Sequence, residues 1–273
     1  MNYLENLFSV EGKTALVTGG ASGIGRMIAT ALVKAGARVF IASRKGEVCE
    51  AVAAELNALD AAGSAEGFAA DLSSDEGITA LSEEIANRTD KLDILVNNSG
   101  ATWGEPLETF PYAAWTKIMG VNVAAMFTLT RNLLPLLEAA SSAEDPARII
   151  NLGSVMGTIP LADGAYSYSV SKAGVHHMTK ILASEFAGKH ITVNAFAPGP
   201  FQSRMTAFAT ASEEGAAAVG SINPSGRIGK PSDIAGATLF LCGKGGAYVT
   251  GAILPIDGGE SVSTGRMGLF DES

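Results

Sequence analysis

The chain has 273 residues, of which 47% are hydrophobic and 17% charged, an ordinary composition for a globular protein. Nineteen basic and 28 acidic residues give a net charge of −9, which argues against nucleic acid or an anionic membrane as a partner. Two cysteines and three histidines are too few for a disulfide framework or a structural metal site, so we expect no metal.

The sequence also bears on where the protein works. No run approaches the roughly 18–20 uninterrupted apolar residues that a membrane-spanning helix requires. Residues 1–11 carry Glu5 and Glu11 and no basic flank, unlike a signal peptide. We therefore expect a cytoplasmic protein without a membrane partner.

Short apolar runs alternate with longer amphipathic stretches along the chain. Strands are predicted at residues 14–17, 38–42, 65–69, 93–96, 148–152, 191–196 and 252–256. Helices are predicted at residues 22–35, 48–59, 78–88, 111–137, 165–186 and 231–241. This alternation implies right-handed βαβ crossovers. The predicted fold class is therefore α/β, a doubly wound parallel sheet of about seven strands with helices on both faces.

No linker long enough to divide these elements occurs, so we predict one domain over residues 1–273. Residues 201–230 are rich in Ala, Gly and Ser and carry no predicted strand or helix. A segment of this kind beside a site is often a mobile lid. Residues 260–273 follow the last predicted strand as a tail whose role the sequence leaves open.

The first predicted strand runs into TGGASGIG, which begins at Thr18 and opens the first predicted helix. Glycines allow a tight turn and bring backbone N–H groups against a pyrophosphate at the positive end of a helix. The flanking strand and helix supply the context that the motif needs, although a turn that merely packs is the alternative. The pattern predicts a Rossmann-type dinucleotide site, with contacts from Gly19, Ser22, Gly23, Ile24 and Gly25.

The end of the second predicted strand selects between the nicotinamide dinucleotides. About 20 residues after the glycine turn, an acidic side chain would accept hydrogen bonds from the ribose hydroxyls of NAD(H). This chain has Ser43, Arg44 and Lys45 there instead. Two cations can pair with a 2′-phosphate, which favours NADP(H) over NAD(H). Ser22, where many NADP enzymes carry another base, makes that preference incomplete, and Arg44 on a solvated turn is the alternative.

The sequence YSVSK, from Tyr168 to Lys172, lies in a long predicted helix. Residues four apart share one helix face, so the phenol and the ammonium are neighbours. A cation about 4 Å away contributes roughly 4 kcal/mol at an effective dielectric constant near 20. That is enough to bring a phenol pKa from near 10 to around 7 before any desolvation. Chance is the alternative for this pair alone, since such pairs occur on many solvent-facing helices.

Small or polar residues follow several other predicted strands. NNSG follows the fourth strand, Ser154 the fifth, and Pro198 with Gly199 the sixth, while Asn122 falls in a long helix between the fourth and fifth strands. The carboxyl ends of parallel strands meet at one edge of a sheet, which is where α/β proteins bind ligands. We therefore expect these residues to lie together.

Together these motifs make the chain resemble the short-chain dehydrogenase/reductase family over residues 10–259. The resemblance rests on TGGASGIG, Asp71 with Leu72, NNSG, Asn122, Ser154, YSVSK, ITVNAFAPG from Ile191, and TG…DGG at residues 250–259. Within the family the chain is most similar to NADPH-dependent β-ketoacyl (3-oxoacyl) reductases of the rhamnolipid-synthesis branch, through ARVFIASR, SRMT, AYSYSVSK and TGAILPIDGG. Ser99 departs from the family's usual alanine in NNAG.

The resemblance implies a role for each matching residue. Tyr168 would protonate a carbonyl oxygen as hydride arrives from the nicotinamide, and Ser154 would polarise that oxygen. Lys172 would bind the nicotinamide ribose and lower the pKa of Tyr168, while Asn122 would hold a water that relays protons to Lys172. Further cofactor contacts, with the adenine, ribose, carboxamide and phosphate, are implied for Asp71, Leu72, Asn98, Gly100, Pro198, Gly199, Phe201 and Ser203.

An apolar mouth is predicted beside this set, which suits a greasy or acyl-bearing ketone. Its candidate residues are Trp103, Met156, Ile159, Leu161, Phe201, Met205 and Phe208. The predicted substrate contacts are Ser154, Met156, Tyr168, Phe201 and Met205. The alternative is that several of the apolar residues are core or subunit contacts.

The expected activity is hydride transfer between NADPH and a ketone or secondary alcohol, with 3-oxoacyl thioester reduction as the favoured case. The first alternative is an NAD(P)-dependent dehydrogenase of a secondary alcohol, sugar or cyclic ketone. The second is a non-catalytic dinucleotide-sensing protein, against which the intact catalytic set argues. The resemblance also implies a homotetramer or homodimer, assembled through the helices at 111–137 and 165–186 and the last strand.

Overall fold

Seven strands form one sheet in the computed structural model, which describes residues 2–160, 164–203, 206 and 210–263. The strands are β1 (Thr14–Thr18), β2 (Arg38–Ser43), β3 (Ser64–Ala69), β4 (Ile94–Asn97), β5 (Ala147–Leu152), β6 (Ile191–Pro198) and β7 (Ile253–Ile256). Their order is β3-β2-β1-β4-β5-β6-β7, and every neighbouring pair is parallel. The predicted doubly wound α/β fold is confirmed, with each strand within two residues of its expected bounds.

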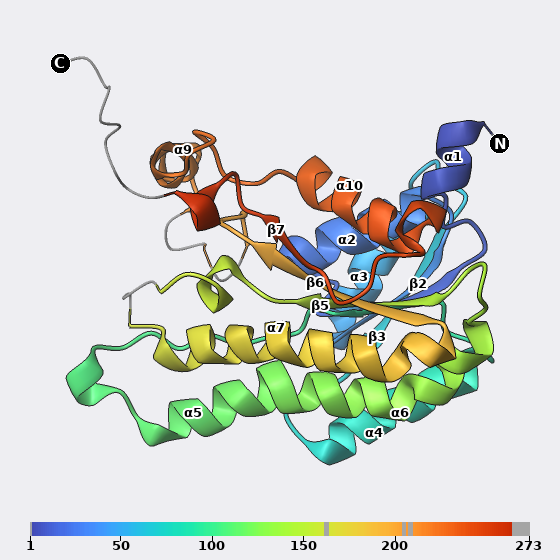
Figure 1. The fold of residues 1–273 in the computed structure, drawn as a ribbon, viewed down its shortest axis with the longest axis horizontal. Helices are drawn as coiled ribbons and strands as arrows, with labels where there is room; N and C mark the ends of the chain where they lie inside the picture. The colour runs from blue at the N-terminus through green and yellow to red at the C-terminus, as the bar shows by residue number, and fades with distance from the viewer. Residues whose placement is uncertain (1, 161–163, 204–205, 207–209, 264–273) are drawn as a thin grey trace.

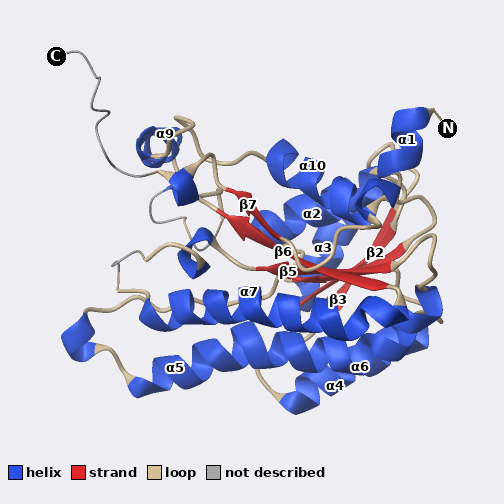
Figure 2. Ribbon diagram, in the orientation of Figure 1, coloured by secondary structure: helices blue, strands red, loops and turns tan. Residues whose placement is uncertain are grey.

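Helices cover both faces of this sheet (Figures 1 and 2). One face carries α2 (Gly23–Lys34), α3 (Gly46–Asn57) and α10 (Pro231–Cys242), and the other carries α4 (Asp75–Arg88), α6 (Ala125–Ala140) and α7 (Tyr166–Phe186). Successive side chains of a strand point to opposite faces, so the buried strands feed two hydrophobic cores. Val17 and Ile41 belong to one core, and Leu16 and Phe40 to the other.

The long helix predicted at 111–137 is interrupted. It consists of α5 (Tyr112–Met119), a π-helical turn, η2 (Gly120–Ala124), and α6. π-helical turns of this kind are frequent at functional sites, and this one contains the buried Asn122. Apolar periodicity does not register a local change of helical repeat, so the pattern predicts one unbroken helix.

Two helices, α1 (Tyr3–Phe8) and α9 (Glu213–Ile222), are absent from the predicted elements. They lie past opposite ends of the sheet (Figure 1). The sequence pattern predicts no helix within residues 201–230, but the structure contains α9 there. Ser212 caps this helix, because its side chain accepts a hydrogen bond from the Gly215 N–H (3.0 Å). Ala- and Gly-rich α9 has no clear apolar stripe, but Ser212 followed by two glutamates is a helix-start signal.

Short 3₁₀ turns connect several of these elements. They are η1 (Leu107–Thr109), η3 (Val155–Gly157), η4 (Ala187–Lys189), η5 (Lys244–Gly246) and η6 (Glu260–Val262). Within the described ranges, none of the helices combines the length and the apolar character needed to cross a membrane.

Candidate active site

The turn between β1 and α2 has the geometry of an anion-binding loop. Gly19 and Gly23 have φ angles of 65° and 52°, a left-handed conformation that costs other residues energy. Ser22 is the N-cap residue of α2, but its side chain makes no capping hydrogen bond. The first N–H groups of α2 therefore point to the space above the turn without a side-chain cap, and such a helix end attracts a phosphate.

Segments from other strands pack tightly against this turn. The Asn98 side chain donates to the Thr18 carbonyl oxygen (2.9 Å), and a Cβ at Gly25 would lie 2.3 Å from Asn98 Nδ2. A Cβ at Gly23 would lie 3.0 Å from the Cβ of Ser203. Only glycines allow these approaches, so the structure brings the predicted cofactor residues of three segments together.

The residues that follow β2 lie beside Asp71, as their predicted common role requires. Arg44 and Asp71 line one pocket of about 450 Å³. Hydrogen bonds from Ser73, and in addition the Arg44 guanidinium, lower the pKa of the Asp71 carboxyl. Ser43 Oγ lies 3.0 Å from a buried cysteine sulfur, and Lys45 is the N-cap residue of α3. A cation and a carboxylate therefore stand where the adenosine end of a dinucleotide is expected.

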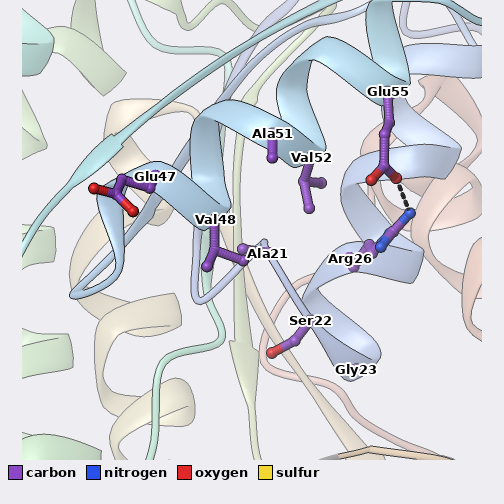
Figure 3. Close-up of a pocket in the computed structure, with 9 residues that line it drawn as sticks. All are labelled: Ala21, Ser22, Gly23, Arg26, Glu47, Val48, Ala51, Val52 and Glu55. Atoms are coloured by element: carbon purple, nitrogen blue, oxygen red, sulfur yellow. Dashed lines mark hydrogen bonds and ion pairs between the residues drawn. The ribbon is translucent and has the colours of Figure 1, made fainter.

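A second pocket, of about 470 Å³, lies between the glycine turn, α2 and α3 (Figure 3). Ser22 and Gly23 line it where the turn enters α2. The Arg26 and Glu55 side chains point toward one another and form an ion pair between the two helices, with Glu47 at the far end of the pocket. Arg26 is thus paired with Glu55, whereas Arg44 and Lys45 form no salt bridge among the described residues.

Tyr168 and Lys172 share one face of α7, as predicted. The Lys172 ammonium nitrogen lies 5.5 Å from the centroid of the Tyr168 ring and donates to the carbonyl oxygen of Leu152 (2.6 Å), the last residue of β5. Lys172 is 5% exposed, and burial lowers its pKa to about 8. The spacing of YSVSK predicts a fixed cation at this position, whereas in the structure the charge of the side chain depends on pH just above neutrality.

Asn122 ties the NNSG segment to α7. Its Oδ1 accepts from the Ala101 N–H (2.8 Å), and its Nδ2 donates to the Ala101 carbonyl oxygen and to Ser171 Oγ (both 2.9 Å). A Cβ at Gly100 would lie 3.2 Å from Asn122 Oδ1 and 3.7 Å from Lys172 Nζ, so both groups face the same glycine. One acceptor position on Oδ1 remains for a water, and the predicted proton relay stays a prediction.

Ser171 is not among the predicted site residues. It is fully buried, receives the hydrogen bond from Asn122, and donates to the Tyr168 carbonyl oxygen (2.7 Å). Its place inside YSVSK, one helical turn after Tyr168, is the signal that could have found it.

Ser154 lies where β5 gives way to the turn η3. Its Oγ accepts from the Met156 N–H (3.2 Å), and the side chain is buried. A Cβ at Gly157 would lie 2.6 Å from the carbonyl carbon of Lys172, so η3 packs directly on the backbone of α7. Tyr168 and Lys172 thus lie on α7, and Asn122 and Ser154 lie on elements that each contact α7.

The residues predicted to form the apolar mouth fall partly within the described part of the chain, and the mouth itself stays a prediction. Met156, within η3, and Ile159, two residues after it, are half-buried. Trp103 is also half-buried; its indole N–H donates to Glu105 (3.1 Å), and the Lys117 ammonium lies 5.4 Å from its ring. Leu161, Met205 and Phe208 lie outside the described residues.

Phe201 departs from its expected place in the mouth. The side chain is 2% exposed and belongs to the hydrophobic core on the α2 face. It fills the space above Gly229, where a Cβ would lie 2.3 Å from the ring. The ring therefore does not line a substrate pocket in this structure. Gly229 lies against it and helps to bury it, a contact between distant residues that the sequence does not show.

The remaining predicted cofactor residues have structural contacts. Pro198 ends β6, and the Gly199 N–H donates to the Ile256 carbonyl oxygen of β7 (3.1 Å). Ile24 and Leu72 pack against the two cores. Their cofactor contacts stay predictions. No group of three or more His, Cys, Asp or Glu side chains that could hold a metal occurs in the part of the chain that the structure describes.

Comparison with known proteins decides the family. A family model described as enoyl-(acyl carrier protein) reductase matches residues 19–261. The rhamnolipids biosynthesis 3-oxoacyl-[acyl-carrier-protein] reductase of Pseudomonas aeruginosa is 46% identical over 92% of this chain and 97% of that protein. The chain belongs to the short-chain dehydrogenase/reductase family.

Two further comparisons place this dehydrogenase/reductase among its relatives. The solved Pseudomonas aeruginosa RhlG/NADP active-site complex superposes with a TM-score of 0.89 at 45% identity, covering 94% of this chain and 99% of that chain. Galactitol 2-dehydrogenase (L-tagatose-forming) of Cereibacter sphaeroides is 39% identical over 96% of this chain and 100% of that protein. The predicted resemblance, including its branch, is confirmed.

Proposed function

We propose that this protein transfers hydride between NADP(H) and a ketone or secondary alcohol, and that the ketone is a 3-oxoacyl thioester. The observation that carries the proposal is the Tyr168–Lys172 face of α7, packed against the turn that bears Ser154. The 46% identical 3-oxoacyl reductase supports the choice of substrate class. The dinucleotide, when bound, supplies or accepts the hydride.

The residues present fit such a dinucleotide. The uncapped start of α2 and the left-handed glycines suit a pyrophosphate. Arg44 and Lys45 suit a 2′-phosphate, since guanidinium and ammonium groups pair with a dianionic group. Lys172 and Asn122 both face Gly100, where the absent side chain leaves space for the nicotinamide end. The predicted cofactor contacts are proposed on these grounds.

The side chains divide the proton chemistry among them. Tyr168 holds the proton at its phenol oxygen and delivers it to the substrate oxygen. The Lys172 ammonium, 5.5 Å from the centroid of the Tyr168 ring, stabilises the resulting phenolate by charge attraction. Because Ser154 Oγ already accepts from the Met156 N–H, its own hydrogen is available to donate to the carbonyl oxygen of the substrate.

A polyol or sugar alcohol is the second candidate substrate class. The galactitol 2-dehydrogenase that is 39% identical over 96% of this chain favours it. Both candidates use the same proton donor and hydride carrier, so they differ in what the mouth around Trp103 and Met156 accepts.

We also propose that residues 1–273 form one dinucleotide-binding and catalytic domain and that the chain acts as a homo-oligomer. Phe127 on α6 and Val170 and Ile181 on α7 are exposed apolar side chains, as are Phe240 on α10 and Tyr248 shortly before β7. Exposed apolar residues on neighbouring helices are suited to contact a second copy.

Steady-state kinetics with NADPH and NADH test the proposed function. We expect kcat/KM with a 3-oxoacyl thioester and NADPH to exceed that with any simple cyclic ketone or sugar by at least tenfold. The thioester is offered on coenzyme A and on a carrier protein. Turnover confined to polyols and sugars would establish the second candidate. NADPH binding without turnover of any ketone would refute the catalytic proposal.

A further inference from the structure

His176 is a buried imidazole that the proposed chemistry does not use. It follows Lys172 by four residues, so Tyr168, Lys172 and His176 succeed one another along one face of α7. Its side chain is 7% exposed, whereas that of the adjacent His177 is exposed to solvent. The helix therefore turns one of two neighbouring imidazoles toward the catalytic edge of the sheet.

The ring touches both ends of the segment that contains Ser154. Its Nδ1 lies 3.5 Å from Oγ1 of Thr158, at the outer limit of a hydrogen bond. At the other end, a Cβ on Gly153 would lie only 2.2 Å from Nε2, so the imidazole edge occupies the place of a side chain there. The Gly153 N–H in turn donates to the Phe196 carbonyl oxygen of β6 (2.8 Å).

Packing alone does not account for an imidazole at this position. Nε2 of His176 is buried and has no hydrogen-bond partner among the described residues. A buried polar atom without a partner costs roughly 1–3 kcal/mol, a cost that leucine of similar size would avoid. Natural sequences accept local conflicts of this kind mainly at functional sites.

The charge state of the ring suits its position behind the catalytic lysine. Burial first, and then the nearby Lys172 and Lys180 ammonium groups, lower the pKa of His176 to about 4. The ring is therefore neutral at neutral pH and adds no second positive charge beside Lys172. A neutral ring can act here only through its shape and its hydrogen bonds.

We propose that His176 is a positioning residue for the reduction: its ring sets the separation between the Ser154 turn and α7, and so between the Ser154 hydroxyl and the Tyr168 phenol. The proposal rests on the proposed function for its kinetic consequence, but the geometry is independent of the substrate. A misplacement of about 1 Å in a catalytic site can cost on the order of 100-fold in rate.

A double-mutant cycle tests whether His176 acts through Ser154. We expect His176→Leu to lower kcat by about 10- to 100-fold, with the Kd for NADPH, measured by fluorescence titration, within about twofold. His176→Asn, which keeps polar atoms near Nδ1, should recover part of the loss, and the exposed control His177→Asn should change kcat by less than about twofold. With Ser154→Ala already present, His176→Leu should lower kcat by less than about twofold further. An equal loss in both backgrounds, or a parallel loss of NADPH affinity, would overturn the proposal.

Crystal structures of the wild type and of His176→Leu test the geometry whatever the substrate is. We expect Ser154 Oγ to move relative to the Tyr168 phenol oxygen by about 1 Å in the variant. Superposable positions of the two oxygens would overturn the proposal. If the wild type reduces another ketone but no 3-oxoacyl thioester, the proposed substrate fails, and the same cycle is run on that ketone.

Discussion

Two buried cations lie at opposite ends of the strand β5. Arg148, near the beginning of this strand, is fully buried, and its guanidinium donates four hydrogen bonds. It donates to the carbonyl oxygens of Leu241 and Gly243 (both 3.1 Å) and of Pro146, and to the Asp145 carboxylate (3.2 Å). Two of these carbonyls belong to the end of α10, where a cation is favoured by the helix dipole.

Lys172, packed at the other end of β5, is satisfied far less completely. It donates to the Leu152 carbonyl oxygen, and it forms no ion pair with a carboxylate among the described residues. Burial lowers the pKa of both side chains, but only for Arg148 do nearby anionic groups, Asp145 foremost, oppose the shift. The Arg148 guanidinium, with four hydrogen bonds, holds elements together. The Lys172 ammonium, whose pKa burial lowers to about 8, is the cation suited to catalysis.

Replacing Lys172 should have the largest effect of these changes, and this effect should fall on activity and hardly on stability. Lys172→Met removes the charge that stabilises the Tyr168 phenolate, so we expect kcat/KM for reduction to fall by about 10²- to 10⁴-fold. The Tm should change by only a few degrees, because deleting a buried charge without an ion partner removes its desolvation cost. Kinetics and thermal unfolding of the same preparation check both points. A large fall in Tm would show that Lys172 is a structural cation like Arg148.

Replacing Arg148 should lower stability and leave the activity of the folded protein largely unchanged. Arg148→Met leaves a carboxylate and several carbonyls without their donor, so we expect a loss of about 3–5 kcal/mol in the free energy of unfolding. The kcat of the folded fraction should remain near that of the wild type. Arg148→Lys keeps the charge but has fewer donors, so its free energy of unfolding should lie between those of the wild type and Arg148→Met. Denaturant unfolding checks this, and a loss below about 1 kcal/mol would contradict it.

The pH dependence of catalysis should follow the Lys172 ammonium. Above about pH 8 this group loses its proton in the folded protein, and with it the charge beside Tyr168. We therefore expect kcat/KM for reduction to fall, by up to about tenfold per pH unit, as the pH rises through about 8. A profile that stays flat to pH 10 would separate the lysine charge from the chemistry.

Stability should move in the other direction over the same range. Between about pH 8 and 10.5 the unfolded chain keeps the Lys172 proton that the folded chain has lost, so stability from this group rises with pH. Relative to Lys172→Met, the wild type should gain up to about 3 kcal/mol on going from pH 7 to 10. The comparison of two variants cancels Cys242, whose pKa burial raises to about 12 and which contributes the opposite slope. If the difference in the free energy of unfolding between the two proteins does not change with pH, the pKa of Lys172 is not lowered in the folded protein.

The smallest effect is expected from the partly exposed partner of Arg148. The Asp145 side chain is 40% exposed, and the carbonyl acceptors of Arg148 remain when it is changed. Asp145→Asn should therefore cost about 1 kcal/mol in denaturant unfolding. A loss equal to that of Arg148→Met would contradict this expectation and would mean that the carboxylate, through Arg148 or through Lys13 at 2.6 Å, is a main structural contact.

The sheet is predictable because each strand is a short run of consecutive residues with a recognisable pattern. Runs such as those of β1 and β5 are short, apolar and bounded by polar or glycine residues, and each is buried on both faces. The glycine turn and the Tyr168–Lys172 spacing are equally local, so the main features of the site are also visible. Fixed spacing along one strand or one helix is what a sequence displays most directly.

What the sequence hides depends on contacts between distant segments. Phe201 looks like a pocket residue because it follows β6, yet Gly229 covers its ring. The lowered pKa of Lys172 comes from its burial, which the residues next to it in the sequence do not predict. The sequence assigns His176 no role, because its contacts with Gly153 and Thr158 arise from the packing of η3 on α7.

The most direct measurement is the rate of NADPH oxidation by a ketone substrate in a single turnover, compared between the wild type and Tyr168→Phe. Removing one hydroxyl while keeping the ring should slow this step by at least about 10³-fold, since no other group on the α7 face replaces the lost proton. The Kd for NADPH should stay within about twofold. Hydride transfer at the wild-type rate in Tyr168→Phe would contradict the assignment of the phenol and its lysine as the proton-donating pair.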